Sequence, residues 1–358
     1  MRNPELILEN YKNKINRSLH SFFNQEAVIN KNRDIFFKQS LKNLKDYHLR
    51  AASKRIRAVL VILGYTLFKK NVRPEIIDIS RSVELIHSSF LIHDDIIDND
   101  ILRRGGPSAH YFFEKWHQRK YRFGNARHFG ASMGILAGDI GFALAYKIII
   151  SSHFQELIKN RVLERFNQMY YDTCYGQMLD VLHDYEKVFS AKEVMDVYRY
   201  KTAKYTIECP LHIGAILAKG NQKQLQLLSR FAIPLGIAFQ IQDDILGMFG
   251  DEKTIGKPVT SDLEEGKKTL LIIRTLGKAN PVQKKILLEY FGHTGIKSKA
   301  LNEVRQIIKE TGSLKYCQNY AKVLVSNAKK ALKHFKKVNK DSLFLLDYLA
   351  DYIIRREY

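Results

Sequence analysis

Two acidic clusters carry residue types and spacings that suit a metal ion. The segments His93–Asp98 (His-Asp-Asp-Ile-Ile-Asp) and Gln242–Gly247 (Gln-Asp-Asp-Ile-Leu-Gly) lie about 150 residues apart, each near the end of an apolar stretch compatible with a helix. Positions i and i+4 of a helix share a face, so Asp94 and Asp98 form a carboxylate pair, with Asp95 turned roughly 100° away. Mg²⁺ usually binds one or two carboxylates plus substrate phosphates. The clusters therefore predict a magnesium–diphosphate site between two helices.

Basic residues that can balance a diphosphate lie near the first cluster. Arg103 and Arg104 follow it, before a Gly-Gly-Pro turn, and Lys54 and Arg57 open an upstream helix, where they are expected to share a face. Arginine binds diphosphate in a bidentate fashion, and a helix amino terminus favours anions. His87 lies two helical turns before the first aspartate of the cluster. Surface ion pairs for the arginines and a structural role for His87 are the alternative interpretations.

The composition favours one all-α domain spanning residues 1–358. Hydrophobic residues make up 45% of the chain, and no Ser/Pro/Gly-rich linker or repeat divides it. The segments 99–127 and 249–266, each after an acidic cluster, are expected to be loops. Helical periodicity predicts helices over roughly 5–24, 54–69, 75–98, 130–152, 154–183, 191–201, 203–219, 222–248, 267–277, 281–291, 299–311, 315–335 and 341–355.

The charge balance predicts affinity for anions. The chain has 58 Lys+Arg against 37 Asp+Glu, a net charge of +21. In the carboxyl-terminal third the lysines alternate with apolar residues at helical spacing, which indicates a solvated helix face. No zinc-finger or RNA-binding signature accompanies the charge, so a nucleic-acid partner is not expected.

The cysteines and apolar runs indicate a soluble, cytoplasmic protein. Three well-separated cysteines favour a reducing compartment over a disulfide framework. The amino terminus lacks a signal-peptide hydrophobic region, and the apolar runs 134–150 and 231–249 are interrupted by polar residues.

Taken in order, several motifs resemble those of the trans-isoprenyl (polyprenyl) diphosphate synthases, most closely the archaeal-type geranylgeranyl diphosphate synthases. The similarity runs from about Lys54 to Lys268. A lone Asp-Asp-x-x-Asp would be weak evidence, whereas this ordered set is specific. It comprises Lys54–Arg57, Glu84–His87, His93–Asp98 followed by Arg103-Arg104, Gly138-Asp139, Gly176–Asp180, Lys201-Thr202, Phe239–Asp244 and Gly256–Asp262.

The resemblance implies an isoprenoid-synthase-type helical bundle around a central active-site cavity, usually assembled as a homodimer. Such enzymes join isopentenyl diphosphate head to tail to an allylic diphosphate (dimethylallyl, geranyl or farnesyl). Three Mg²⁺ ions would hold the allylic diphosphate through Asp94, Asp98 and Asp243. Metals and fixed cations stabilise the growing charge of the leaving group more than the ground state. The departing diphosphate itself is the expected base.

The resemblance also assigns the substrate contacts. The allylic diphosphate is expected to contact Arg103, Lys201, Thr202, Gln240 and Lys257, and isopentenyl diphosphate to contact Lys54, Arg57, His87 and Arg104. Asp180 is expected to orient Lys201 or a metal-bound water, a helix-surface aspartate being the alternative.

Product length in such enzymes depends on the helix below the first cluster. The position five residues before Asp94, where a bulky aromatic residue stops elongation, is Ser89, with Phe90 beside it and Ile86, Leu85 and Ser82 further down. A small residue there and no insertion in the cluster predict geranylgeranyl diphosphate or a somewhat longer product.

Three features depart from the family pattern. Gly247 stands where a third aspartate is usual, as in archaeal geranylgeranyl synthases, and Ala52-Ser53 and Ala58 replace a Gly-Gly pair and a proline. The aromatic and basic stretch at about 110–130 is longer than usual. It is expected to be an extended surface loop, a lid, a partner site or a transient contact with a membrane surface.

Two other classes of function remain open. A class I terpene cyclase shares the first cluster, but Asp244–Gly247 does not supply its second metal motif. A non-catalytic subunit of a heteromeric synthase, or a basic helical binding protein, would be expected to lack the Asp94/Asp98 pair.

Overall fold

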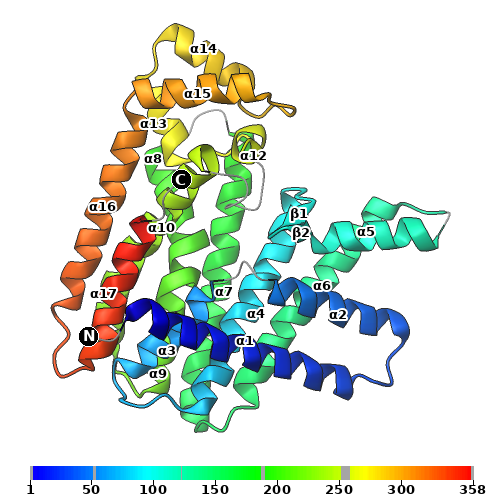
Figure 1. Cartoon of the computed structure of the whole chain (residues 1–358), viewed down its shortest axis with the longest axis vertical. Helices are drawn as coiled ribbons and strands as arrows, with labels where there is room; N and C mark the ends of the chain where they lie inside the picture. Colours follow the sequence, from blue (N-terminus) through cyan, green and yellow to red (C-terminus); the bar gives the residue numbers. More distant parts are fainter. Residues whose placement is uncertain (1–2, 51–53, 122, 187–189, 251–258, 356–358) are drawn as a thin grey trace. The chain divides into compact units, whose positions relative to one another are not determined.

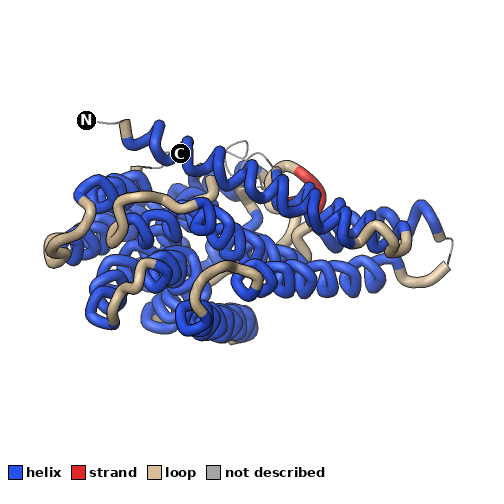
Figure 2. Tube along the Cα trace, turned by 90° about the horizontal axis from the view of Figure 1, so that it is seen from below, coloured by secondary structure: helices blue, strands red, loops and turns tan. Residues whose placement is uncertain are grey.

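The computed structural model describes residues 3–50, 54–121, 123–186, 190–250 and 259–355. Within these residues the chain is helical apart from turns and one pair of two-residue strands (Figure 2). It divides into two compact units, Met1–Leu163 and Glu164–Tyr358, which are described separately. The all-α fold class predicted from the sequence is confirmed.

The first unit is built on the packing of α4 against α6. Its elements are α1 (Pro4–Ile29), α2 (Ile35–Leu49), α3 (Ile56–Thr66), α4 (Pro74–Ile97), β1 (Leu102–Arg103), β2 (Gly106–Pro107), α5 (Ala109–Lys120), α6 (Ala126–Ile150) and the start of α7 (Glu156–Tyr185). Glycines on α6 let α4 approach closely, since a Cβ at Gly138 would lie 2.2 Å from His93 Nε2. Asp34 caps α2 by accepting from the Phe37 amide.

The second unit continues α7 and centres on the long helix α10 (Gln222–Phe249). Its other helices are α8 (Ala191–Val197), η1 (Tyr198–Glu208), α9 (Cys209–Leu217), α12 (Ser261–Glu264), α13 (Leu270–Lys278), α14 (Pro281–Tyr290), α15 (Ser298–Glu310), α16 (Ser313–Leu332) and α17 (Lys340–Ile354) (Figure 1). The η1 segment is a π-helix, a rare form that often marks functional sites.

The largest error in the predicted elements lies at 99–127, which was expected to be a loop. Helix α5 occupies Ala109–Lys120, and its aromatic side chains pack inward: Trp116 stacks on Phe129, and both contact Phe36 of α2. Helix α2 was also not predicted. Aromatic residues that bury one another across α2, α5 and α6 stabilise these helices, which is a tertiary effect.

Helix α6 is long and apolar enough to cross a bilayer, by length and composition alone. Half of its apolar window is buried in the fold, against α4 and α5, as in the core helix of a globular protein. The length and composition of α6 are therefore weak evidence for a membrane span.

Candidate functional site

Asp94 and Asp98 lie one turn apart at the carboxyl-terminal end of α4. The Asp98 amide donates to the Asp94 carbonyl oxygen at 2.8 Å, so the backbone between them is helical and their side chains leave one face. Both are half-buried. The pair offers the hard oxygen atoms that magnesium binds.

Asp95 points into the protein and holds Arg103. Its fully buried carboxylate accepts from Tyr47 Oη at 2.9 Å and from Arg103 Nε at 2.6 Å. Burial raises the pKa of Asp95, and Arg103 and Tyr47 oppose the rise. Arg103 also donates to Asp100 at 2.8 Å, so its guanidinium is fixed on two sides.

A short hairpin positions the two arginines. Leu102 pairs with Pro107 across β1 and β2, and Arg104 and Gly105 both have positive φ angles, 52° and 72°, as in a type I′ turn. Arg50, at the end of α2, donates to the carbonyl oxygens of Arg103 and Pro107, both at 2.7 Å. The end of α2 therefore clamps the hairpin.

His87 and Arg104 form a part-buried hydrogen-bonded pair. His87 Nε2 lies 3.0 Å from Arg104 Nη2, and because a guanidinium only donates, Nε2 is the acceptor and Nδ1 carries the proton. Burial lowers the pKa of His87 well below its ordinary value, and Arg57 and Arg104 lower it further, so the ring is neutral at pH 7. Within the described residues, Arg104 Nη1 is buried without a hydrogen-bond partner. A buried donor beside positive charge suits an anion.

The other two basic residues expected at this site differ from their predicted placement. Helix α3 begins at Ile56, so Lys54 precedes it and does not share a helical face with Arg57. Lys54 is exposed and Arg57 half-buried. Arg55, between them, is 2% exposed and donates to Glu84 at 3.1 Å, so its role is structural.

The residues expected to control product length line α4 below the first cluster. Ser82, Leu85, Ile86 and Ser89 are buried. Ser89 Oγ donates to the Leu85 carbonyl oxygen at 3.0 Å, and a Cβ at Gly141 would lie 2.1 Å from Ser89 Oγ. Position 89 therefore faces α6 at a point of very close helix packing.

Phe90, beside Ser89, is half-buried. Its ring packs edge-on against that of Phe142, with the ring centroids 5.2 Å apart.

In the second unit, Asp243 and Asp244 lie near the end of α10. Asp244 is buried and accepts from the Tyr198 hydroxyl and from Gln240 Nε2, the latter at 2.8 Å. Gln240 Oε1 accepts in turn from Thr202 Oγ1 at 2.7 Å. Gln240 thus connects the second acidic cluster to η1. Asp243 is half-buried.

A third carboxylate lies beside this pair although position 247 is glycine. Asp262, from α12, occupies the space at Gly247: a Cβ there would lie 2.3 Å from Asp262 Oδ2. Burial raises the pKa of Asp244 to about 8, and repulsion from Asp262 and Asp243 adds to the rise. Because Gly247 stands where the family usually has an aspartate, the Asp262 carboxylate of α12 has room beside α10.

Lys201 and Asp180 form an ion pair at 2.5 Å between η1 and α7. The helices approach closely because Gly176 lacks a side chain: a Cβ there would lie 2.2 Å from the Lys201 amide nitrogen. The ion pair is compatible with the expectation that Asp180 orients Lys201, which stays a prediction.

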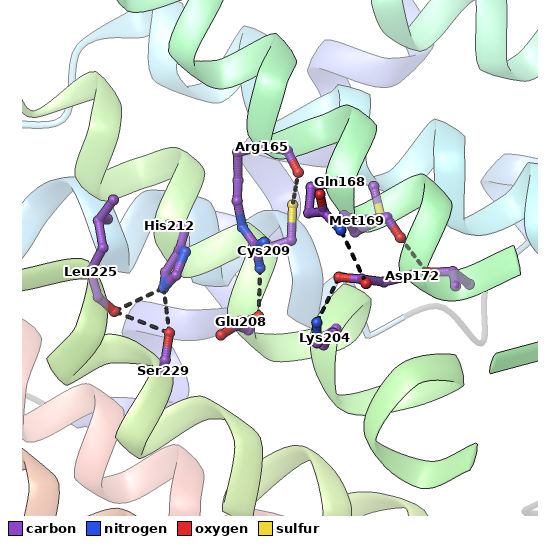
Figure 3. A network of polar contacts seen from close by, with 11 residues as sticks. Arg165, Gln168, Met169, Asp172, Lys204, Glu208, Cys209, His212, Leu225 and Ser229 are labelled. Carbon is purple, nitrogen blue, oxygen red and sulfur yellow. Dashed lines mark hydrogen bonds and ion pairs between the residues drawn. The ribbon is translucent and has the colours of Figure 1, made fainter. Parts of the chain in front are cut away.

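Two further ion pairs join η1 to α7 (Figure 3). Arg165 Nη2 lies 2.5 Å from Glu208, and Lys204 Nζ lies 2.8 Å from Asp172. These contacts fix the backbone that carries Lys201.

Several residues of these networks were not singled out from the sequence. The sequence alone places Asp95 only on a different face of the helix from Asp94 and Asp98, and it indicates no role for Tyr47, Arg50 or Tyr198. The apolar spacing of Phe37, Leu41 and Leu44 after Asp34 was the available signal for α2. Lys257 and Ala52-Ser53 lie outside the described residues.

Comparison with known proteins gives one family. The model of the polyprenyl synthetase family matches residues 38–311. The geranylgeranyl diphosphate synthase of Saccharolobus solfataricus is 34% identical over 346 residues, covering 94% of this chain and 98% of that protein. The short chain isoprenyl diphosphate synthase of Methanocaldococcus jannaschii is 34% identical over 320 residues, with coverages of 89% and 90%.

Solved structures agree with the sequence comparison. The geranylgeranyl pyrophosphate synthase of Corynebacterium glutamicum, complexed with isoprenyl diphosphate and magnesium, superimposes with a TM-score of 0.92 at 27% identity. The superposition covers 98% of this chain and 99% of the other.

Proposed function

The chain belongs to the polyprenyl synthetase family and is a prenyltransferase, and from this premise we propose the reaction that it catalyses. It joins isopentenyl diphosphate head to tail to an allylic diphosphate and releases geranylgeranyl diphosphate or a somewhat longer trans-prenyl diphosphate. The observation that carries this proposal is the first unit's pairing of a two-carboxylate helix end, Asp94 and Asp98, with the part-buried His87–Arg104 pair. A metal-bound diphosphate needs the carboxylates, and a metal-free diphosphate needs fixed positive charge such as that of Arg104.

The acidic residues suit magnesium. Asp94 and Asp98 in the first unit and Asp243 in the second offer hard oxygen ligands in partly exposed positions. We propose that these residues hold three ions with the allylic diphosphate, as the family resemblance implies. When bound, magnesium stabilises the negative charge that grows on the leaving diphosphate.

Arg103 and Lys201 supply fixed positive charge to the allylic diphosphate, together with Lys257. Arg103 is held by Asp95 and Asp100, and Lys201 by Asp180, so neither needs to reorganise during the reaction. Thr202 and Gln240 contribute polar contacts, and their mutual hydrogen bond supports a fixed arrangement.

Isopentenyl diphosphate is bound by Arg104, His87, Arg57 and Lys54. The buried, unsatisfied Arg104 Nη1 supports this assignment within the described chain. Fixing this substrate orients its double bond toward the allylic cation, an entropic advantage.

A terpene cyclase is the nearest rival, and it would not need the second diphosphate site. The decisive experiment incubates the purified protein with Mg²⁺, labelled isopentenyl diphosphate and allylic primers of increasing length. We expect label in a prenyl diphosphate of about geranylgeranyl length. No incorporation with any primer would exclude the synthase, and cyclic hydrocarbon products would indicate the cyclase.

The protein is further proposed to act as a cytoplasmic homodimer. Helix α7 exposes an apolar stripe at helical spacing: Tyr171, Tyr175, Met178, Leu182 and Tyr185, each at least 45% exposed. A stripe of this kind suits a helix–helix contact between copies. Sedimentation velocity of the Met178→Glu variant tests whether this stripe forms the dimer contact. We expect the variant to shift from dimer to monomer. The three free cysteines suit a reducing compartment.

A further inference from the structure

One end of the first unit carries a groove lined by lysine and apolar side chains. The groove lies between α1 and α2 and has a volume of about 460 Å³. Asp46 is its one lining carboxylate. Its other lining residues are Phe23, Asn24, Ala27, Lys31, Lys38, Leu41, Lys42 and Lys45.

Large apolar side chains stand exposed at the turn from α1 to α2 and after α5. Val28 and Ile29 at the end of α1 are 67% and 65% exposed, and Ile35 at the start of α2 is 79% exposed. Phe123, after α5, is also 79% exposed. Several exposed apolar residues at neighbouring turns form an apolar patch. Such a patch indicates an interaction site, whereas single exposed apolar residues do not.

A chain of aromatic contacts connects the start of α2 to the segment after α5. Phe36 of α2 contacts Trp116 of α5, with ring centroids 4.9 Å apart. Trp116 contacts Tyr121 at 5.7 Å, and Tyr121 contacts Phe123 at 6.1 Å. Figures 1 and 2 show both turns at the same end of this unit.

Basic side chains outnumber acidic ones on this surface. Over the described residues of 28–38 and 119–128, the only carboxylate is Asp34, which is used to cap α2. Lys120 lies over the rings of Trp116 and Tyr121, which keeps its charge at the surface. The exposed basic residues of these two segments are Lys31, Arg33, Lys38, Arg119, Lys120 and Arg127.

We propose that this end of the first unit docks on anionic lipid bilayers. The docking surface consists of Val28, Ile29, Ile35 and Phe123, which enter the interface, and the lysine groove, which receives a lipid phosphate. Exposed apolar side chains ringed by basic ones bind bilayers through both buried apolar area and attraction to anionic lipid. A nucleic acid would use the charge but not the exposed Ile35 and Phe123. The proposal goes beyond the proposed reaction and does not rest on it.

Vesicle co-sedimentation of the full chain tests this proposal. We expect at least about 10-fold tighter binding to phosphatidylcholine vesicles containing phosphatidylglycerol than to phosphatidylcholine alone, weakened by salt. Trp116 is the single tryptophan of the chain, so its fluorescence reports binding at this surface without a label. Equal binding to neutral vesicles, or none to anionic ones, would overturn the proposal.

Matched variants separate the apolar and charged contributions. Ile35→Ser with Phe123→Ser, and separately Lys38→Glu with Lys42→Glu, should each weaken vesicle binding by roughly 10-fold or more. The controls change similarly exposed residues of α14: Val282→Ser, and Lys284→Glu with Lys285→Glu. All variants should keep wild-type turnover with a short water-soluble primer. If the Ile35/Phe123 variant binds vesicles normally, or changes the oligomeric state in sedimentation, the surface is not a bilayer contact.

Discussion

The carboxylate of Asp262 occupies the space that a side chain at Gly247 would fill. A Cβ at position 247 would lie 2.3 Å from Asp262 Oδ2, closer than non-bonded atoms approach. The contact joins α12 to α10 beside Asp243 and Asp244, so that three carboxylates gather in the second unit.

Gly247→Ala should lower activity without lowering stability. The added methyl group must displace the Asp262 carboxylate, while alanine in a helix interior is favoured over glycine by about 1 kcal/mol. We expect the Mg²⁺ concentration for half-maximal rate to rise on the order of 10-fold, as when a supporting group of a metal site is lost. Gly277→Ala, where a Cβ would meet nothing within 4 Å, is the control. An unchanged Mg²⁺ dependence would contradict a role for Asp262.

Asp94→Ala should lower turnover by ~10²–10³-fold or more, because it removes a preorganised charge contact on the leaving group. The melting temperature should change little, since Asp94 is half-buried at a helix end. The exposed Asp341→Ala is the control. Steady-state turnover at saturating substrate decides, and a near-wild-type rate would refute the metal role.

Arg104→Gln should raise KM for isopentenyl diphosphate more than it lowers kcat. A charge-assisted hydrogen bond to a diphosphate contributes about 1.5–3 kcal/mol, so roughly a 10- to 100-fold increase in KM is expected. The allylic KM should stay within about 2-fold in the same assay. Arg230→Gln, on the exposed side of α10, controls for the loss of charge. Equal effects on both substrates would argue against separate diphosphate sites.

Ser89→Phe should shorten the product and also destabilise the protein. The phenyl ring must fit where Ser89 Oγ already contacts α6 at Gly141, and overpacking of this kind costs about 1–3 kcal/mol. The neighbouring Ser88 is also buried on α4 and points elsewhere, so Ser88→Phe should destabilise without changing product length. Product chromatography distinguishes them, and an unchanged length in the Ser89 variant would show that position 89 does not limit the chain.

His212 should make the second unit sensitive to acid. Burial lowers the pKa of His212 from 6.5 to about 4, and Arg165 adds to this. Between these two values the unfolded chain binds a proton that the folded chain does not, so stability is complete above pH 6.5 and falls as the pH drops toward 4. The loss should reach roughly 3 kcal/mol.

Urea unfolding at pH 7 and at pH 4.5 measures this loss. The His212→Gln variant should lose less stability on acidification than the wild type, whereas a change at the exposed His293 should have no effect. An equal loss in the His212 variant would assign the acid sensitivity to other groups.

The parts of the site that sequence predicts well are local ones. Asp94 and Asp98 are four residues apart on one helix, and helical geometry alone sets their relationship. The hydrogen bond from Tyr47 to Asp95 joins residues that are 48 positions apart. It depends on α2, which packs against α5 through aromatic side chains. The approach of Asp262 to Gly247 likewise follows from tertiary packing. Spacing in the sequence carries no signal for such contacts.

Helix α2 is a single rigid rod with different partners at its two ends. Ile35 at its start belongs to the docking surface, and Arg50 at its end clamps the hairpin that carries Arg103 and Arg104. Thermodynamic linkage then imposes reciprocity. Any change in diphosphate affinity that bilayer docking causes through α2 is matched by a change of bilayer affinity by the same factor when the substrate binds. The fifteen residues of α2 therefore connect the proposed docking surface to the hairpin that carries Arg103 and Arg104.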